Sequence, residues 1–282
     1  MLPPYREHSL RAPLSAWVEC VWMLDAPARP EGAAAESIFP DGCVELIVQL
    51  DAPARAARGE RSFHLQPPAF LMGPFASALR LAPAGRMKTL GVRFRPGGAA
   101  VFLPFPVDLL GAAEVPVDAV FGAAGARLVG RLGAAPSDEA RVSIVEEFLD
   151  SRLLAGGGAP ENSPVAFAVR RMLASPRYSV SGLAHDCGWS PRQLERRFRA
   201  ETGLSPRLLA RIIRFQRVLR ALGREDAEWV SVALDCGYSD QPHLIRDFRA
   251  FTGQTPAAFR RSEPSLAAAF VAPERLERFF AG

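Results

Sequence analysis

The stretch Ala184-His-Asp-Cys-Gly-Trp-Ser190 decides how the last third of this sequence folds, because the chain contains it twice. The second copy, Ala233-Leu-Asp-Cys-Gly-Tyr-Ser239, begins 49 residues after the first. After one inserted residue the correspondence continues at a spacing of 50, from the segment Leu194–Pro206 to the segment Leu244–Pro256. A repeat of this length indicates one supersecondary unit that has been duplicated.

Each copy predicts a helix, a tight turn and a second helix. In the first copy the helix covers Val180–Cys187, and Gly188 follows where helices commonly end in a left-handed conformation. Ser190 is then a typical N-cap, with Pro191 in the first turn, where a missing N–H costs nothing. This second helix ends at Gly203.

The second copy has the same order of signals. Its predicted first helix is Val230–Cys236, its turn glycine is Gly237, and its cap is Ser239 or Asp240. One long helix, Pro206–Leu222, is predicted between the copies. Helical spacing turns the following side chains inward in the second helix of each copy: Leu194, Phe198, Leu244 and Phe248.

The opposite, outward stripes of these two helices are polar. The first stripe holds Arg192, Glu195, Arg196 and Arg199, and the second holds Gln241, Pro242, Ile245, Arg246 and Arg249, with His243 near its border. Arginine pairs with guanine, glutamate accepts from cytosine and glutamine pairs with adenine in the major groove. The candidate DNA-contacting residues are Arg192, Gln193, Glu195, Arg196, Arg199, Gln241, His243, Arg246 and Arg249.

The distribution of charge supports a polyanionic partner. Residues 1–163 carry 15 basic and 18 acidic side chains, whereas residues 164–262 carry 17 arginines and 9 acidic side chains. A basic module beside an acidic body is typical of nucleic-acid binding, and two rigidly joined helix-turn-helix units suit adjacent major-groove segments on one DNA face. The alternatives are an arginine-rich bundle with solvated faces and a helical repeat that binds proteins.

The region from about Pro164 to Arg261 resembles the AraC/XylS family of transcription regulators. The resemblance rests on LAHDCGWSPRQLERRFRAETGLSP and VSVALDCGYSDQPHLIRDFRAFTGQTPAAFRR. It implies seven helices, and base contacts from Arg192, Glu195, Arg196, Gln241 and Arg246. Pro242 departs from a common family pattern, which has a small polar residue there, and we expect the first of the two helices to make most of the base-specific contacts.

The N-terminal region is predicted to be rich in short strands, which makes the whole chain an α+β protein. Turn signals at Pro40-Asp-Gly42 and Arg95-Pro-Gly-Gly98 separate apolar runs of strand length, a pattern that favours a small barrel or sandwich. The predicted strands lie within residues 17–24, 43–50, 70–72, 78–81 and 90–94.

This region also resembles the cupin-like barrels that serve as effector sensors in such regulators. The segments that carry the resemblance are FPDGCVELIV and GVRFRPGGAA, of an uncharacterised subtype. The histidines that hold metal in enzymatic cupins are missing, which favours binding without catalysis. Candidate effector-binding residues are Trp17, Trp22, Glu45, Phe94 and Arg95, although each is equally explained as barrel core or surface.

The predicted domains are a sensor over residues 1–155, a Gly/Pro linker over 156–163, a DNA-binding domain over 164–262 and a tail over 263–282. The sensor ends in an amphipathic helix, residues 137–154, with Val142, Val145, Leu149 and Leu153 on its apolar face. A further short helix is predicted around residues 274–280.

Other features limit the function classes. The sequence has no signal-peptide pattern and no apolar run long enough to span a membrane, which predicts a cytoplasmic protein. Scattered histidines and four separated cysteines predict no metal, no cofactor and no catalytic site, and Cys187 and Cys236 are expected in the core.

The expected partners are double-stranded promoter DNA, RNA polymerase, a small-molecule effector and a second copy of the chain. The competing functions are a cupin-like enzyme with a DNA-targeting domain and a nonspecific nucleic-acid binder.

Overall fold

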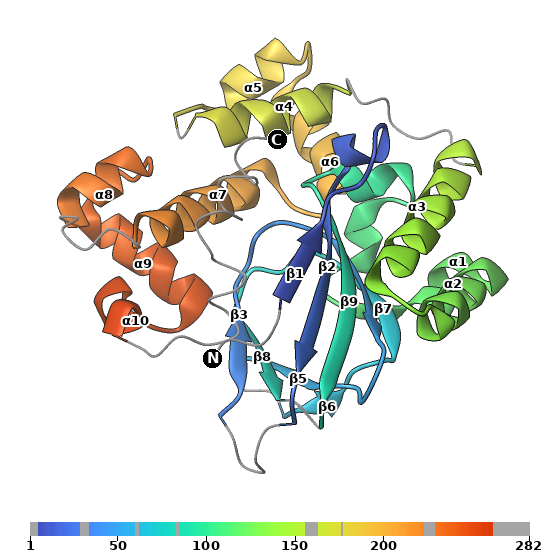
Figure 1. Cartoon of the computed structure of the whole chain (residues 1–282). Helices are drawn as coiled ribbons and strands as arrows, with labels where there is room; N and C mark the ends of the chain where they lie inside the picture. Colours follow the sequence, from blue (N-terminus) through green and yellow to red (C-terminus); the bar gives the residue numbers. More distant parts are fainter. Residues whose placement is uncertain are drawn as a thin grey trace.

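The computed structural model describes residues 5–28, 34–59, 62–82, 85–155, 163–175, 177–222 and 229–261. Figure 1 shows strands in the centre of the molecule, three green helices on one side, yellow helices at the top and orange to red helices on the other side. None of the described helices combines the length and the apolar character that crossing a membrane requires. Residues 156–162 of the predicted linker (156–163) and the predicted helix at 274–280 lie outside the described residues.

The strands form two antiparallel sheets. The six-stranded sheet has the order β1-β2-β9-β4-β7-β10, and the four-stranded sheet has the order β3-β8-β5-β6. The strands of the first are β1 Tyr5–His8, β2 Val18–Ala26, β9 Met87–Phe94, β4 Glu45–Gln49, β7 Ala69–Met72 and β10 Glu114–Pro116. Those of the second are β3 Glu36–Ile38, β8 Leu79–Ala82, β5 Arg55–Arg58 and β6 His64–Leu65.

The alternation of side chains along β2 explains the layering of the N-terminal domain. Cys20, Trp22 and Leu24 point into a buried cluster shared by the two sheets, whereas Val21 and Met23 belong to a second cluster on the other face. The indole of Trp22 covers its cross-strand neighbour Gly91, where an added Cβ would lie 2.1 Å from Trp22 Cε2. The six-stranded sheet is therefore the middle layer between the four-stranded sheet and helices.

The helices on the outer face are α1 Val117–Phe121, α2 Ala123–Ala134 and α3 Asp138–Ala155, and the short 3₁₀ turns are η1 Leu14–Ala16, η2 Gly98–Val101 and η3 Val107–Leu110. Val145 and Leu149 of α3 are buried against the sheet, as their spacing predicts.

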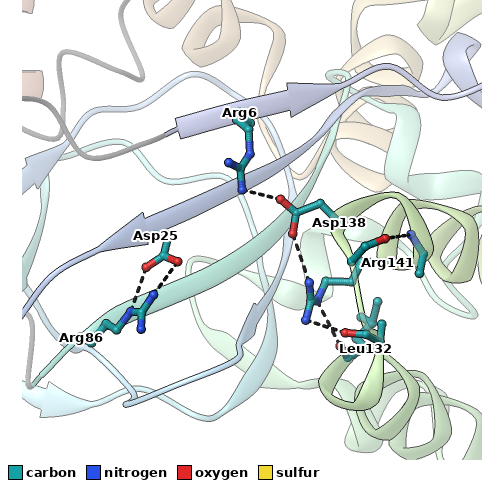
Figure 2. Close-up of polar contacts among 9 residues, drawn as sticks. Arg6, Asp25, Arg86, Leu132, Asp138 and Arg141 are labelled. Atoms are coloured by element: carbon teal, nitrogen blue, oxygen red, sulfur yellow. Dashed lines mark hydrogen bonds and ion pairs between the residues drawn. The ribbon is translucent and has the colours of Figure 1, made fainter.

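Figure 2 shows how polar contacts fix the start of α3: Asp138 pairs with Arg6 of β1 and with Arg141, at 2.5 and 3.1 Å. The buried Arg141 also donates from Nε to the carbonyl of Leu132 in α2 at 3.3 Å. Arg86, which directly precedes β9, forms a separate ion pair with Asp25 of β2.

The C-terminal region is entirely helical within the described residues and has the seven helices that the family resemblance implies. They are α4 Pro164–Ala174, α5 Val180–Asp186, α6 Pro191–Thr202, α7 Pro206–Ala221, α8 Trp229–Asp235, α9 Gln241–Thr252 and α10 Pro256–Arg261. One hydrophobic cluster joins all of them and includes Phe39 and Cys43 of the N-terminal domain.

The predicted strands at 17–24, 43–50, 70–72, 78–81 and 90–94 are confirmed as β2, β4, β7, β8 and β9. The expectation of one cupin-like barrel is only partly met, because the described strands pair into two open antiparallel sheets and not into one closed barrel. The short strands β1, β3, β5, β6 and β10 and the helices α1 and α2 were not predicted.

Candidate nucleic-acid interface

The two helix-turn-helix units are α5 with α6 and α8 with α9, and α7 connects them (Figure 1). Gly188 and Gly237 occupy the turns with φ of 68° and 86°, and Gly203 and Gly253 end the second helices with φ of 75° and 80°. A residue with a Cβ rarely adopts this conformation, so the repeated glycines give both units the same bend.

The second helix of each unit begins with a different cap. Ser190 caps α6, and the N3 residue Gln193 closes a capping box by accepting from the Ser190 backbone N–H at 2.9 Å. Asp240, and not Ser239, caps α9: its carboxylate accepts from the His243 backbone N–H at 2.7 Å. That hydrogen bond lowers the pKa of Asp240 below its usual range, with help from Ser239 and nearby cationic side chains.

The inward faces are as predicted. Leu194, Phe198, Leu244 and Phe248 are each at most 1% exposed and lie in the C-terminal cluster. Cys236 is buried there too, whereas Cys187 is half-buried and its thiol contacts the Pro164 carbonyl at 3.3 Å. Among the described residues, no group of three or more His, Cys, Asp or Glu side chains is arranged to hold a metal ion.

The outward face of α6 is a basic surface. Arg192, Arg196 and Arg199 are exposed, and Glu195 forms an ion pair with Arg199 at 3.0 Å. Gln193 is also exposed, but its side-chain oxygen is already used by the capping box. Glu195, Arg199 and Gln193 thus interact within α6 itself, and Arg192 and Arg196 are the residues of this stripe that are best placed to contact a partner.

The outward face of α9 contains fewer exposed residues than the sequence predicts. Arg246 and Arg249 are exposed and Gln241 is half-exposed, but Ile245, expected on this stripe, packs against the hydrophobic cluster. His243 lies edge-on to the ring of Tyr238 at 5.1 Å, and its Nδ1 is 3.1 Å from Ser239 Oγ. The residue that sequence reasoning missed is Asp247, which is buried and pairs with Arg211 of α7.

The five candidate effector residues do not form one pocket. Trp22 and Glu45 line a cavity of about 50 Å³ between the two sheets. Trp17 and Arg95 line another, of about 230 Å³, between the N-terminal domain and α4 and α6. Phe94 is a core residue, 2% exposed, whose ring packs on Phe102.

The larger cavity also contains residues that local sequence signals did not identify. Ser163, Val169 and Arg170 come from the start of the C-terminal region, and Glu201 comes from the end of α6. Burial raises the pKa of Glu201, against the opposing effects of its hydrogen bond from Ser163 at 3.1 Å and of the nearby Arg197. These residues lie between 146 and 184 positions after Trp17, so only the fold brings them together.

Comparison with known proteins adds the following. Residues 183–262 match the model of a helix-turn-helix domain family, and residues 6–116 match that of a domain of unknown function (DUF6597). The HTH-type transcriptional regulator VirS of Mycobacterium tuberculosis is 31% identical over 133 residues, which are 46% of this chain and 38% of VirS. The chain thus spans well under half the length of that curated relative.

Two solved structures are similar to parts or most of the chain. The DNA-binding domain of AdpA, determined in complex with a target DNA, is 30% identical with a TM-score of 0.34, covering 40% of this chain and 99% of that one. ToxT from Vibrio cholerae is 9% identical with a TM-score of 0.44, covering 91% of this chain and 97% of that one. The C-terminal domain is thus an AraC-family helix-turn-helix domain, and residues 6–116 form a domain whose family has no known function.

Proposed function

We propose that this protein is a sequence-specific DNA-binding transcription regulator whose helices α6 and α9 enter successive major-groove segments of promoter DNA. The observation that carries the proposal is the pair of structurally matched helix-turn-helix units, each with exposed arginines at equivalent outward positions: Arg196 and Arg199 in α6, Arg246 and Arg249 in α9. Major-groove segments on one DNA face recur about every 34 Å, which a rigidly joined pair of units can match.

We assign base contacts mainly to α6, through Arg192, Glu195 and Arg196, because these side chains are close together on a polar face. In α9 only Gln241 and Arg246 are suited to base contact, since Pro242 lacks a donor and Ile245 packs inward. Gln193, Arg199, His243 and Arg249 have the position and chemistry to contact phosphates and to fix the register of the protein on DNA.

We further propose that a small molecule controls binding from the cavity between the two domains. Trp17 supplies an aromatic wall and Arg95 a cation there, and most of the lining is apolar, which is typical of small-molecule sites. A ligand in this cavity touches the N-terminal domain, α4 and the end of α6 together, so its binding free energy favours one relative placement of the domains. In this scheme the two-sheet domain is the sensor, and a second copy of the chain or RNA polymerase contacts surfaces outside the cavity.

Hydroxyl-radical footprinting tests the DNA proposal on the sequences upstream of the protein's own gene and of its neighbours. The expected result is protection over about two helical turns on one DNA face, with the unprotected genomic segments bound much more weakly. The second experiment measures the affinity for DNA by titration at several salt concentrations. A steep salt dependence without any preferred segment would identify a nonspecific nucleic-acid binder and contradict the proposal.

A further inference from the structure

A turn of the N-terminal domain completes the hydrophobic core of the helix-turn-helix region. Phe39, which directly follows β3, is 8% exposed and belongs to the C-terminal cluster and not to the clusters of its own domain. Its ring lies edge-on to Phe259 of α10 at 5.4 Å and to Phe215 of α7 at 6.4 Å. Figure 1 shows β3 on the side of the sheets that faces α7, α9 and α10.

These aromatic contacts continue to the second recognition helix. Phe259 lies edge-on to Phe248 of α9 at 5.4 Å, and Phe215 contacts Phe248 at 5.3 Å and Phe251 at 5.0 Å. Phe248 and Phe251 are buried on the inner face of α9. A single aromatic residue therefore separates Phe39 from the helix that carries Gln241 and Arg246.

The backbone of the turn is also fitted to α7. Gln216, only 1% exposed, donates from Nε2 to the Pro40 carbonyl at 2.6 Å. Gly42 has φ of 81°, and a Cβ added there would lie 2.6 Å from Leu209 Cδ1. A side chain at position 42 would therefore force either Leu209 or the turn to shift.

An ion-pair chain holds the turn from the other side. Asp41 accepts from the Cys43 backbone N–H at 2.9 Å and lies 3.6 Å from the guanidinium of Arg93, which is 1% exposed. Arg93 pairs with Glu45 at 2.6 Å, and Glu45 accepts from the indole of Trp22 at 3.3 Å. The turn is therefore fixed to the sheets as firmly as to the helices.

We infer that Phe39 is a positioning residue for the second helix-turn-helix unit: the N-terminal domain sets the placement of α9 relative to α7 through the aromatic cluster of Phe39, Phe215, Phe248, Phe251 and Phe259. The inference deepens the proposed function, since it states how the sensor domain acts on one of the two DNA-contacting helices. Removal of the Phe39 ring leaves a cavity between α7 and α10, and the local packing of α9 loosens.

The test compares full-length Phe39→Ala with Phe75→Ala. Phe75 is equally buried, at 8% exposed, but belongs to the cluster between the sheets. Amide hydrogen exchange without DNA is the first readout, and we expect faster exchange in α9 and α10 for Phe39→Ala only. On a footprinted operator, Phe39→Ala should weaken protection of one major-groove segment about tenfold relative to the other.

Gln216→Met and Phe39→Leu keep the inference testable if Phe39→Ala does not fold. Gln216→Met removes only the hydrogen bond to Pro40, and Phe39→Leu removes the ring contacts with less loss of volume than Phe39→Ala. Exchange in α9 and α10 that is unchanged in these variants, or changed equally in Phe75→Ala, would overturn the inference. So would equal weakening of both DNA segments. A wild-type chain that protects no DNA contradicts the proposed function, and the exchange experiment then still decides the role of Phe39.

Discussion

Arg211 of α7 and Asp247 of α9 form an ion pair across the second helix-turn-helix unit, with Arg211 Nη2 2.9 Å from Asp247 Oδ1. The side chain of Asp247 is 8% exposed, and Arg214 and His243 lie at 3.9 and 4.0 Å from its other oxygen. A buried carboxylate of α9 beside two arginines of α7 fixes the recognition helix to the connecting helix.

We predict that Asp247→Ala lowers the free energy of unfolding by about 2 kcal/mol, because it removes these contacts and leaves polar groups without partners. Glu195→Ala is the matched control, since it breaks the solvent-exposed pair with Arg199 and such pairs contribute under about 1 kcal/mol. Urea unfolding of the full chain measures both. Equal losses for the two variants would show that the buried pair has no special role.

The repeat made the helix-turn-helix region predictable, because its signals are local. Gly188, Gly203 and Ser190 act on their own helix ends, and the 3.6-residue period alone turns Leu194 and Phe198 inward. The burial of Asp247 could not be predicted in this way, because a charged residue on a helix usually faces solvent. Its partner Arg211 also lies on another helix.

The N-terminal domain was predicted in outline only. Long strands such as β2 can be predicted because their side chains are mostly apolar and include β-branched and aromatic residues. By contrast, β5 and β6 are short and include exposed polar residues, so their pairing depends on neighbours that are distant in the sequence. Phe39 lies in a predicted turn region, and no local pattern reveals that its ring enters the core of the other domain.

The exposed position of Arg196 gives a direct test of base recognition. We predict that Arg196→Ala weakens operator binding by about 1–3 kcal/mol and relaxes the preference at one base pair, because a bidentate contact to guanine is lost. Arg131→Ala, which removes the same charge from α2 in the N-terminal domain, is the control. Competition binding to operators with single base changes measures the effect. Uniform weakening across all operators would instead assign Arg196 to a phosphate.

The N-caps of α6 and α9 differ in charge, so substitutions at the two caps distinguish the contribution of the hydrogen bond from that of the charge to protein stability. Ser190→Ala should lower stability by about 1 kcal/mol, since it leaves an N-terminal amide without its acceptor. Asp240→Ala should lower stability for the same reason. Asp240→Asn keeps an acceptor but removes the charge.

Because the pKa of Asp240 is lowered in the folded protein, its ionised form stabilises the fold above the unfolded pKa of about 3.9, and this contribution is lost as pH falls through the lowered value. The acid limb of the stability profile should therefore be shallower in Asp240→Asn than in wild type. A limb of unchanged steepness in thermal melts would argue against the charge of Asp240 as its source.

The half-buried Glu201 at the end of α6 has the opposite pH dependence. Burial raises its pKa, so the folded chain binds a proton that the unfolded chain has already released. Its ionisation therefore destabilises the fold as pH rises from about 4.3 through the raised folded value, and the full effect remains at higher pH. Glu201→Gln should remove this loss and be more stable than wild type at neutral pH but not below pH of about 4.

Ser163→Ala provides the complementary variant, because the hydroxyl of Ser163 donates to Glu201 at 3.1 Å and thereby lowers its pKa. Without that donor the pKa of Glu201 rises further and the pH dependence becomes larger, even though the variant is less stable overall through loss of the α4 cap. Melting temperatures of the three proteins between about pH 4 and 8 separate the two effects. If the Glu201→Gln profile runs parallel to that of wild type throughout, ionisation of Glu201 is not a source of the pH dependence of stability.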